Sequence, residues 1–298
     1  MPYRAVIDLG TNTFHLLIVE PLHGPIPFRE IFRESRFVKL AEEGIERIGD
    51  APFARALETV RYFAEKLSEY AVQDVAAFGT AALRTAENGP DFISKVRELT
   101  GIRIRTISGD QEAGLIARGV QLALGRITER ALIMDIGGGS VEFILIEDNQ
   151  PVWARSFPVG VAVLYRQFHR HEPLLASDNL AIRSFLDYQL QTLRAILSEK
   201  PVAHLVGAAG TFDVLANILR AGRLNAQACR IDLTGFEALF SRLLSATQFE
   251  RHAMEDIPED RADLIVVALV LVDYVVREFG IRQLTVSTYS MKEGMLVG

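Results

Sequence analysis

Apolar and polar positions follow the same pattern at the start of each half of the chain. Residues 5–20 (AVIDLGTNTFHLLIVE) contain an apolar run, a short turn of small and polar residues, and a second apolar run. Residues 132–147 (LIMDIGGGSVEFILIE) have the same order, 127 positions later, and align with the first segment without a gap. The pairs of positions with matching chemistry are Asp8 with Asp135, Gly10 with Gly137, Thr13 with Ser140, and Glu20 with Glu147. Two apolar runs joined by a tight turn predict a β-hairpin, so we expect each half to open with one.

After each hairpin, the pattern alternates between the spacing typical of strands and the spacing typical of helices. Further strands are predicted at residues 28–40, 74–79, 102–107, 152–158, 202–206 and 284–287. Helices are predicted at residues 52–70, 91–99, 108–124, 161–168, 177–198, 212–219, 234–245, 263–279 and 290–296. The predicted apolar stripe of the helix at 177–198 is Leu180, Phe185, Leu190, Leu193 and Leu197. The polar segments 79–90 and 254–263 are expected to be loops.

Strands and helices that alternate in both halves predict the α/β fold class, with two lobes and a cleft between them. The likeliest boundary is the glycine and charged residues of segment 125–130, which divides the chain into residues 1–125 and 126–298. The closing helix, within residues 289–298, is a candidate to pack back on the first lobe. Because ligands in such folds bind where strand ends and loops converge, we expect the two hairpin turns to meet across the cleft.

Composition excludes several classes of partner. The net charge of −6 argues against nucleic acid, because binding its phosphates requires clustered Lys and Arg. The single cysteine, Cys229, cannot form an intramolecular disulfide and fits a reducing compartment. The longest apolar run, residues 264–276, contains Asp273 and is too short to span a bilayer, so no membrane association is expected. The chain enters a strand without a charged and apolar leader, so we expect no secretory signal and a cytoplasmic location.

The hairpin turns carry the residue types of a phosphate site. Glycines allow another group to approach the backbone closely, and exposed N–H groups and hydroxyls can hold phosphate oxygens. An aspartate at the strand end, beside such a turn, can hold a divalent cation directly or through water. A single hairpin of this kind would be read as an ordinary acidic turn. Two in register, each opening one half of the chain, favour a paired phosphate site.

Five segments, in this order, resemble one protein family. They are DLGTNTFHLLI, GTAALRTAEN, ISGDQEAGLIARGV, DIGGGSVEF and GAAGT, and they extend over nearly the whole chain. Together they resemble the Ppx/GppA phosphatases, which are exopolyphosphatases and guanosine pentaphosphate phosphohydrolases. The paired hairpins are also similar to those of the actin, sugar-kinase and chaperone ATPase superfamily. The resemblance implies two actin-like (ribonuclease H-like) lobes and hydrolysis of a terminal phosphoanhydride with a divalent metal.

The resemblance also implies roles for individual residues. Glu112 corresponds to the glutamate that activates water, although by position alone it would be an ordinary first-turn acid that the helix dipole stabilises. Asp8, Asp135 and Glu142 are the candidate ligands of Mg²⁺, which we expect nearer the second hairpin, because His15 stands where the repeat has Glu142. Arg84 could clamp a phosphate, with a plain surface arginine as the alternative. The other expected phosphate-binding residues are Thr11, Asn12, Thr13, Gly137, Gly138, Gly139, Ser140, Gly210 and Thr211.

Three segments depart from the pattern of the family. Gln111 precedes Glu112 where relatives often have a second glutamate, which leaves one local carboxylate. The turn GAAGT stands where the family pattern is GxGGT, and Ala208 and Ala209 reduce its backbone freedom. The last motif has Tyr289 for a glycine and Lys292 for an arginine. A guanine nucleotide site is therefore less well supported than the phosphate site.

We therefore predict an exopolyphosphatase that releases terminal orthophosphate from linear polyphosphate. A guanosine pentaphosphate phosphohydrolase is the first alternative. An ATP-dependent sugar kinase and a phosphate or nucleotide sensor without enzymatic activity are less favoured, the kinase because GAAGT departs from an adenosine turn. The apolar helix at 263–279 could pack in a dimer interface as readily as in the core. A homodimer is therefore left open.

Overall fold

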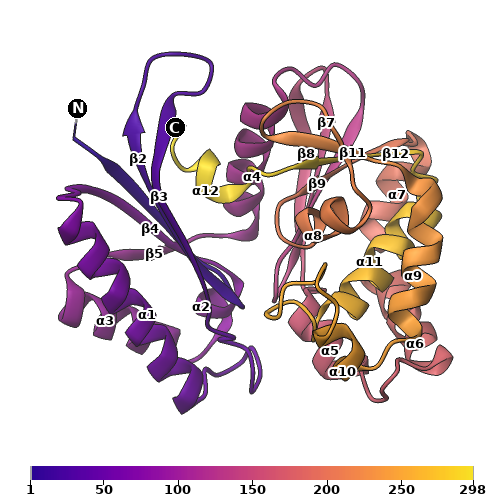
Figure 1. Cartoon of the computed structure of the whole chain (residues 1–298), viewed down its shortest axis with the longest axis horizontal. Coiled ribbons are helices and arrows are strands. Elements are labelled where there is room, and N and C mark those ends of the chain that lie inside the picture. The colour runs from indigo at the N-terminus through magenta and orange to yellow at the C-terminus, as the bar shows by residue number, and fades with distance from the viewer. Residues whose placement is uncertain (1, 298) are drawn as a thin grey trace.

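The computed structural model describes residues 2–297, which form two mixed β-sheets with helices around and between them (Figure 1). Within this range the first sheet has the strand order β3-β2-β1-β4-β5. Its strands are β1 (Arg4–Leu9), β2 (Thr13–Pro21), β3 (Phe28–Phe37), β4 (Asp74–Gly79) and β5 (Ile104–Thr106). Strands β1 and β2 are the first predicted hairpin, and β1 pairs in parallel with β4 on its other side.

The second sheet has the order β10-β11-β12-β9-β6-β7-β8. Its strands are β6 (Ala131–Ile136), β7 (Val141–Glu147), β8 (Gln150–Phe157), β9 (His204–Ala208), β10 (Gly222–Arg223), β11 (Ala228–Ile231) and β12 (Gln283–Ser287). Strands β6 and β7 are the second hairpin, and β6 pairs in parallel with β9. The short strand β10, at the edge of this sheet, and its neighbour β11 were not predicted from the sequence.

The helices form three layers around the sheets (Figure 1). The first sheet is covered outside by α1 (Asp50–Glu69) and α3 (Gly89–Thr100). Between the sheets lie α4 (Gly109–Leu124) and α12 (Met291–Gly294). The helices that pack into the core of the second lobe are α5 (Val161–Phe168), α6 (Ala176–Gln189), α7 (Gln191–Glu199), α8 (Thr211–Ile218), α9 (Phe236–Ser245) and α11 (Ile265–Glu278). The remaining short helices are α2 (Ala81–Thr85), the 3₁₀ turn Leu233–Gly235 and α10 (Gln248–His252).

Alternation along the repeated strands explains how the aspartates come to face the same space. Successive side chains of a strand point to opposite faces of its sheet. Ile7 and Met134 occupy equivalent places in the two repeats, and each packs on the outer face of its sheet. Val6 and Ile133 each pack on the inner face, between the sheets. Asp8 lies two positions after Val6, and Asp135 lies two positions after Ile133. Both aspartates therefore point inward, near the end of their strands.

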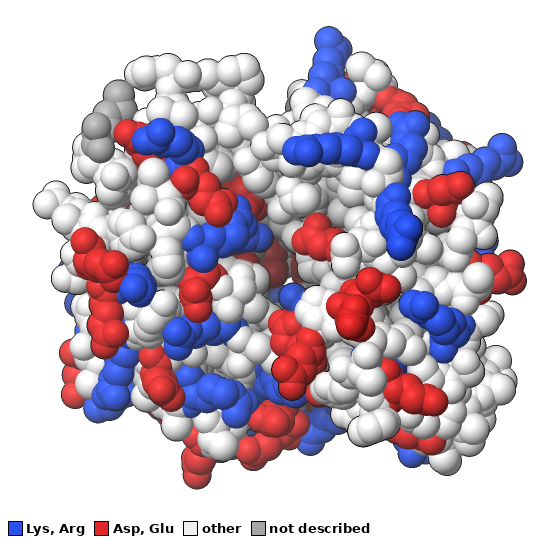
Figure 2. All heavy atoms as spheres, viewed as in Figure 1, with Lys and Arg blue, Asp and Glu red and all other residues white. Residues whose placement is uncertain are grey.

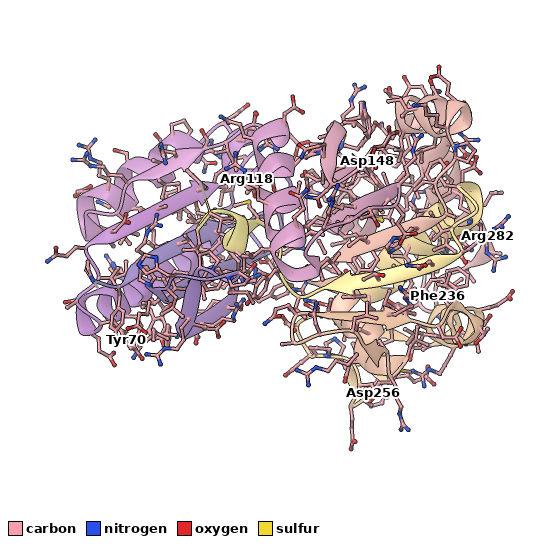
Figure 3. All side chains as sticks on the ribbon, turned by 90° about the horizontal axis from the view of Figure 1, so that it is seen from above. Tyr70, Arg118, Asp148, Phe236, Asp256 and Arg282 are labelled. Atoms are coloured by element: carbon pink, nitrogen blue, oxygen red, sulfur yellow. The ribbon has the colours of Figure 1, made fainter. Side chains whose placement is uncertain are left out.

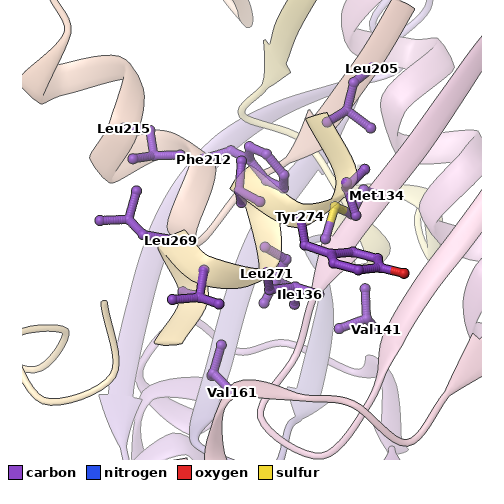
Figure 4. Close-up of a cluster of buried hydrophobic side chains, with 14 of the residues drawn as sticks. Met134, Ile136, Val141, Val161, Leu205, Phe212, Leu215, Leu269, Leu271 and Tyr274 are labelled. Carbon is purple, nitrogen blue, oxygen red and sulfur yellow. The ribbon is translucent and has the colours of Figure 1, made fainter. Parts of the chain in front are cut away.

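Helix α11 is the centre of the core of the second lobe (Figure 4). Its residues from Ile265 to Val275 are all buried, and Leu269 and Leu271 pack among side chains of β6, β7 and α8. The predicted burial of this helix is therefore confirmed. Residues 265–275 of this helix therefore serve the core, and the homodimer stays a prediction.

Two glycines allow α12 to lie directly on α4. A Cβ on Gly119 would lie 1.9 Å from the carbonyl oxygen of Ser290, and a Cβ on Gly294 would lie 1.8 Å from that of Leu115. No side chain larger than hydrogen fits at either place. The closing helix therefore lies against a helix that precedes residue 125, in the layer between the sheets (Figure 3, where Arg118 marks α4). The division of the chain at residues 125 and 126 stays a prediction.

Several local predictions need correction. The helix at 177–198 is interrupted at Leu190, and its buried stripe in the first half runs through Ile182 and Leu186. Leu180, which was predicted in the stripe, is 66% exposed. The residues on the same helix face as Leu190 lie four and eight positions before it, and these are Leu186 and Ile182. The expected loop at 79–90 contains α2, and the expected helix at 234–245 begins only at Phe236, after the 3₁₀ turn. Among residues 2–297, none of the helices is both long enough and apolar enough to cross a membrane.

Candidate active site

The turns of the two hairpins have the same backbone geometry. In the first, the amide of Gly10 donates to the carbonyl of Thr13 at 3.1 Å. In the second, the amide of Gly137 donates to the carbonyl of Ser140 at 3.0 Å. The strands that flank the turns pair in the same register, so the match read from the sequence is a match in three dimensions.

The two turns touch each other across the space between the lobes. A Cβ built on Gly138 would lie 2.7 Å from the side chain of Asn12. A Cβ on Gly139 would lie 3.0 Å from the hydroxyl oxygen of Thr11. Glycine is therefore required at both positions for the turns to approach this closely. The expectation that the hairpin turns meet in one cleft is confirmed by these contacts.

In each turn the carbonyls are hydrogen-bonded to another segment of the chain, whereas several amides have no such partner. The carbonyls of Thr11 and Asn12 accept hydrogen bonds from the amides of residues 38–40. The carbonyls of residues 137–139 accept from the amides of residues 160–162, at the start of α5. Within residues 2–297, the amides of Thr11, Asn12 and residues 138–140 donate to no protein group. Buried amides without a partner are costly, so these turns are suited to an anion with several oxygens.

The turns line a cleft of about 440 Å³. Figure 2 shows a hollow between the lobes with acidic atoms at its bottom and basic side chains near its rim. Twelve of the predicted site residues lie in the wall of this cleft. They are Asp8, Thr11, Asn12, Thr13, Glu112, Asp135, Gly137, Gly138, Gly139, Ser140, Glu142 and Gly210.

Arg84 and Thr211 do not line the cleft. The guanidinium of Arg84 donates to the carbonyl of Ile107 at 2.6 Å and lies 3.4 Å from Glu112 Oε2. Arg84 also lines a second pocket, on the other side, together with residues of α3 such as Arg97. Thr211 is buried as the first residue of α8. Arg84 thus reaches the cleft only through its contact with Glu112.

The start of α4 fixes Glu112. The Ser108 hydroxyl accepts from the amide of Gln111 at 3.2 Å, and the Gln111 side chain accepts from the amide of Ser108 at 2.9 Å, which is a capping box. Glutamine serves here as well as glutamate, and its side chain is exposed. Asp110 is exposed as well, whereas Glu112 is buried. Of the acidic residues in this turn, only Glu112 faces the cleft.

Burial shifts the pKa values of the cleft carboxylates upward. Desolvation raises the pKa of Asp8 to about 7 against the opposing effect of Lys292, and raises that of Glu142 to about 7. Desolvation also raises the pKa of Asp135 to about 6, although the hydrogen bond from Ser290 lowers it. The pKa of Glu112 is raised by burial and then by the charges of Glu142 and Asp8. The cleft therefore concentrates negative charge that a bound cation would stabilise.

The donor set of the cleft suits a hard divalent cation. Glu142 accepts from the hydroxyls of Ser140 at 2.7 Å and Ser156 at 2.6 Å, both on the same oxygen, which leaves the other oxygen available. Asp135 accepts from Ser290 on one oxygen only. In the part of the chain that the structure describes, no three acidic, histidine or cysteine side chains form a ligand cluster by themselves. Mg²⁺ fits this arrangement, because it commonly binds one or two carboxylates together with water and substrate phosphates.

Sequence reasoning missed several residues of the cleft wall. Lys292 is buried at the start of α12, and Arg33 and Arg261 supply further positive charge. His15 also lines the cleft, and its Nδ1 lies 2.7 Å from the hydroxyl of Ser35. The repeat could have identified His15, because it occupies the place of Glu142. Asp213, Asp260 and Ser290 were also missed, because they come together only through the fold.

Two segments singled out earlier have structural roles. Asn88 binds the backbone of Ile48 through both side-chain atoms, at 2.9 Å each, which joins two loops. In the GAAGT turn, Ala208 ends β9, whereas Ala209 has a φ of +47°. That conformation costs a non-glycine residue roughly 1–2 kcal/mol. The amide of Ala209 donates to the carbonyl of Ser287, which holds the turn in place.

Comparison with known proteins identifies the family. The model of the Ppx/GppA phosphatase family matches residues 18–298. The chain belongs to the Ppx/GppA phosphatase family. This Ppx/GppA phosphatase is 37% identical to an exopolyphosphatase from Cytophaga hutchinsonii, with a TM-score of 0.92 over 99% of this chain and 96% of the other. The structure of the Aquifex aeolicus PPX-GPPA enzyme has 22% identity and a TM-score of 0.80, with 99% of both chains covered.

These findings establish the class of the protein. The predicted fold, two actin-like lobes around a cleft, is confirmed. This Ppx/GppA phosphatase is a phosphoanhydride hydrolase. Phosphatases of its family generally depend on a divalent cation, which agrees with the chemistry of the cleft.

Proposed function

We propose that this phosphatase is an exopolyphosphatase, which hydrolyses the terminal phosphoanhydride bond of linear polyphosphate. The observation that carries the proposal is the pair of touching turns with unpartnered amides. Because one turn belongs to each lobe, successive phosphate groups of a linear chain can bind to both at once. The similarity to the Cytophaga hutchinsonii exopolyphosphatase, at 37% identity over nearly the whole chain, supports the same substrate class.

The reaction requires a base beside the terminal phosphate, and Glu112 is positioned for it. Its buried carboxylate lies in the wall of the cleft that contains both turns. In the proposed step, Glu112 accepts a proton from water as the water oxygen attacks the terminal phosphorus. The bond from that phosphorus to the bridging oxygen breaks, and the shortened chain leaves with this oxygen. Amides of the two turns stabilise the charge on the transferred phosphoryl group.

We assign the cation to Asp8, Asp135 and Glu142. When bound, a divalent ion supplies positive charge to the bridging and leaving oxygens of the substrate. The three carboxylates lie on the inner ends of the repeated hairpins, and each retains at least one oxygen that accepts no side-chain hydrogen bond within residues 2–297. Burial raises the pKa values of all three, and a bound cation would favour their ionised forms.

The nucleotide alternative has weaker support in the cleft. Tyr289, which stands in the last family motif, packs on Phe28 with ring centroids 5.9 Å apart, and it does not line the cleft. It is therefore not placed to stack on a guanine base. The left-handed Ala209 also brings a Cβ to a turn where the family pattern has glycine.

Release of orthophosphate from defined substrates tests the proposal. Purified protein with Mg²⁺ is given linear polyphosphate, guanosine pentaphosphate, or ATP with a set of sugars, and products are separated by gel and ion exchange. We expect orthophosphate from polyphosphate, with progressive shortening of the chain and a higher kcat/KM than for the nucleotide. Preference for guanosine pentaphosphate, transfer to a sugar, or binding of polyphosphate without turnover would each reject the proposal in favour of one named alternative.

A further inference from the structure

The two equivalent aspartates of the repeat differ in what holds them. The Ser290 hydroxyl, which lies 155 positions away in the sequence, donates a hydrogen bond to Asp135 Oδ2. In the described range 2–297, no side chain donates to the carboxylate of Asp8. In the repeat alone the two carboxylates are equivalent. The difference in their hydrogen bonding arises from the segment between β12 and α12.

The hydroxyl of Ser290 has one proton, and it donates this proton to Asp135. Ser290 is the N-cap residue of α12, but its hydroxyl accepts no capping hydrogen bond from that helix. The Glu293 carboxylate instead accepts from the backbone amide of Ser290 at 2.8 Å, which fixes the backbone that carries the hydroxyl. The direction of the bond to Asp135 suits an ionised Asp135, since a carboxylate can only accept.

Ser290 is held rigidly on all sides. Glu293 is fully buried, and its second oxygen accepts from Arg33, on β3 of the first sheet, at 3.0 Å. On the opposite side, the backbone of Ser290 lies against Gly119 of α4, where no side chain fits. A serine held between β3 of the first sheet and α4 can orient the carboxylate that it contacts.

We propose that Ser290 is a positioning residue, which orients Asp135 so that its second oxygen is presented to the divalent cation. The inference rests on the proposed metal-assisted reaction and adds a division of roles to it. Asp135 is the preset ligand, and Asp8 is the ligand free to adapt as substrate enters. Groups that hold a metal ligand in place in this way are typically worth ten- to a hundredfold in metal affinity.

The plainer alternative is that Ser290 only fixes the start of α12. Replacement by glycine separates the two roles, because glycine is well tolerated at an N-cap position but removes the hydroxyl from Asp135. Ser290→Thr keeps a hydroxyl for Asp135. Thr247 offers a control at another helix start, since its hydroxyl caps α10 by accepting from the amide of Glu250 and has no contact with a cleft carboxylate.

Binding of Mn²⁺, followed by electron paramagnetic resonance without substrate, tests the inference independently of turnover. We expect Ser290→Gly to weaken Mn²⁺ binding about tenfold, with Ser290→Thr close to the wild type and Thr247→Gly unchanged. The Mg²⁺ concentration for half-maximal hydrolysis should rise by the same factor, with KM for polyphosphate at saturating metal unchanged. Wild-type affinity in Ser290→Gly would overturn the inference. If the wild type released no phosphate from polyphosphate while Ser290→Gly still weakened Mn²⁺ binding, the proposed function would fail and the role of Ser290 would stand.

Discussion

Arg84 lies against Glu112, with Nη1 of its guanidinium 3.4 Å from Oε2 of the carboxylate. The same nitrogen donates to the carbonyl of Ile107 at 2.6 Å, which fixes the guanidinium beside Glu112. Burial and the charges of Glu142 and Asp8 raise the pKa of Glu112, and Arg84 acts against them. In this position Arg84 favours the deprotonated form of the proposed base, and its binding of phosphate stays a prediction.

Replacement of Arg84 by glutamine should therefore act on the base. Without the guanidinium the pKa of Glu112 rises further, and a base functions only when it is deprotonated. The acid limb of the kcat/KM profile should move to higher pH, and turnover at pH 7 should fall by roughly tenfold or more, with recovery in alkaline buffer. A pH series of polyphosphate hydrolysis measures this. Arg84→Lys, which keeps the charge, is the control and should shift less. An unmoved profile with a raised KM would show instead that Arg84 binds phosphate.

Gly138→Ala should separate the two turns. The new Cβ would lie 2.7 Å from the side chain of Asn12, so either this side chain or one of the turns must move. A displacement near 1 Å at a reacting group can cost about a hundredfold in rate, and we expect a loss of that order in kcat/KM for polyphosphate.

Gly114 provides the matched control on the helix that carries Glu112. A Cβ at Gly114 meets no atom within 4 Å, so alanine there should stabilise α4 by up to about 1 kcal/mol and leave hydrolysis intact. Thermal melts and steady-state rates of both variants test the difference. Full activity in Gly138→Ala would mean that contact of the turns is not needed.

The cleft carboxylates make the stability of the metal-free protein depend on pH. The pKa values of Asp8 and Glu142 are raised to about 7, and that of Asp135 to about 6. Between about pH 4, near the unfolded values, and pH 7, the folded protein binds more protons than the unfolded chain. Its stability should therefore fall as the pH rises through this window. Melting temperatures in EDTA at pH 5.5 and pH 8 measure this effect.

Addition of Mg²⁺ should reverse the trend. A bound cation replaces the protons on the carboxylates, so it should raise the melting temperature more at pH 8 than at pH 5.5. The variant Asp8→Asn with Asp135→Asn should lose the response to Mg²⁺ and show a weaker pH dependence, part of which Glu142 retains. Equal stabilisation by Mg²⁺ at both pH values would separate these carboxylates from the metal site.

The fold and the hairpin part of the site could be predicted because their information is local. Alternation of apolar residues fixes which face each strand residue occupies, so the repeat placed Asp8 and Asp135 correctly in the cleft. The glycine and hydroxyl content of the turns then pointed to anion binding. The class of the protein came from the order of motifs and is confirmed by the family match.

The remainder of the site depends on contacts between distant segments, which no local pattern encodes. Ser290 meets Asp135 only because α12 is packed on α4 through paired glycines. Arg84 stood out as a polar residue of a loop, but it lies on the short helix α2, and its side chain contacts Ile107 and Glu112. Lys292 was noted only as a departure from a motif, and its burial in the cleft required the structure.

The most direct test of the account is the turnover of Glu112→Gln with polyphosphate and Mg²⁺, compared with Asp110→Asn. Both variants remove one carboxylate from the start of α4, but only that of Glu112 is buried in the cleft. We expect Glu112→Gln to lower kcat by roughly two to four orders of magnitude with polyphosphate binding nearly unchanged, and Asp110→Asn to retain wild-type turnover. Turnover by Glu112→Gln within a few-fold of the wild type would contradict the assignment of the base, and with it the proposed reaction.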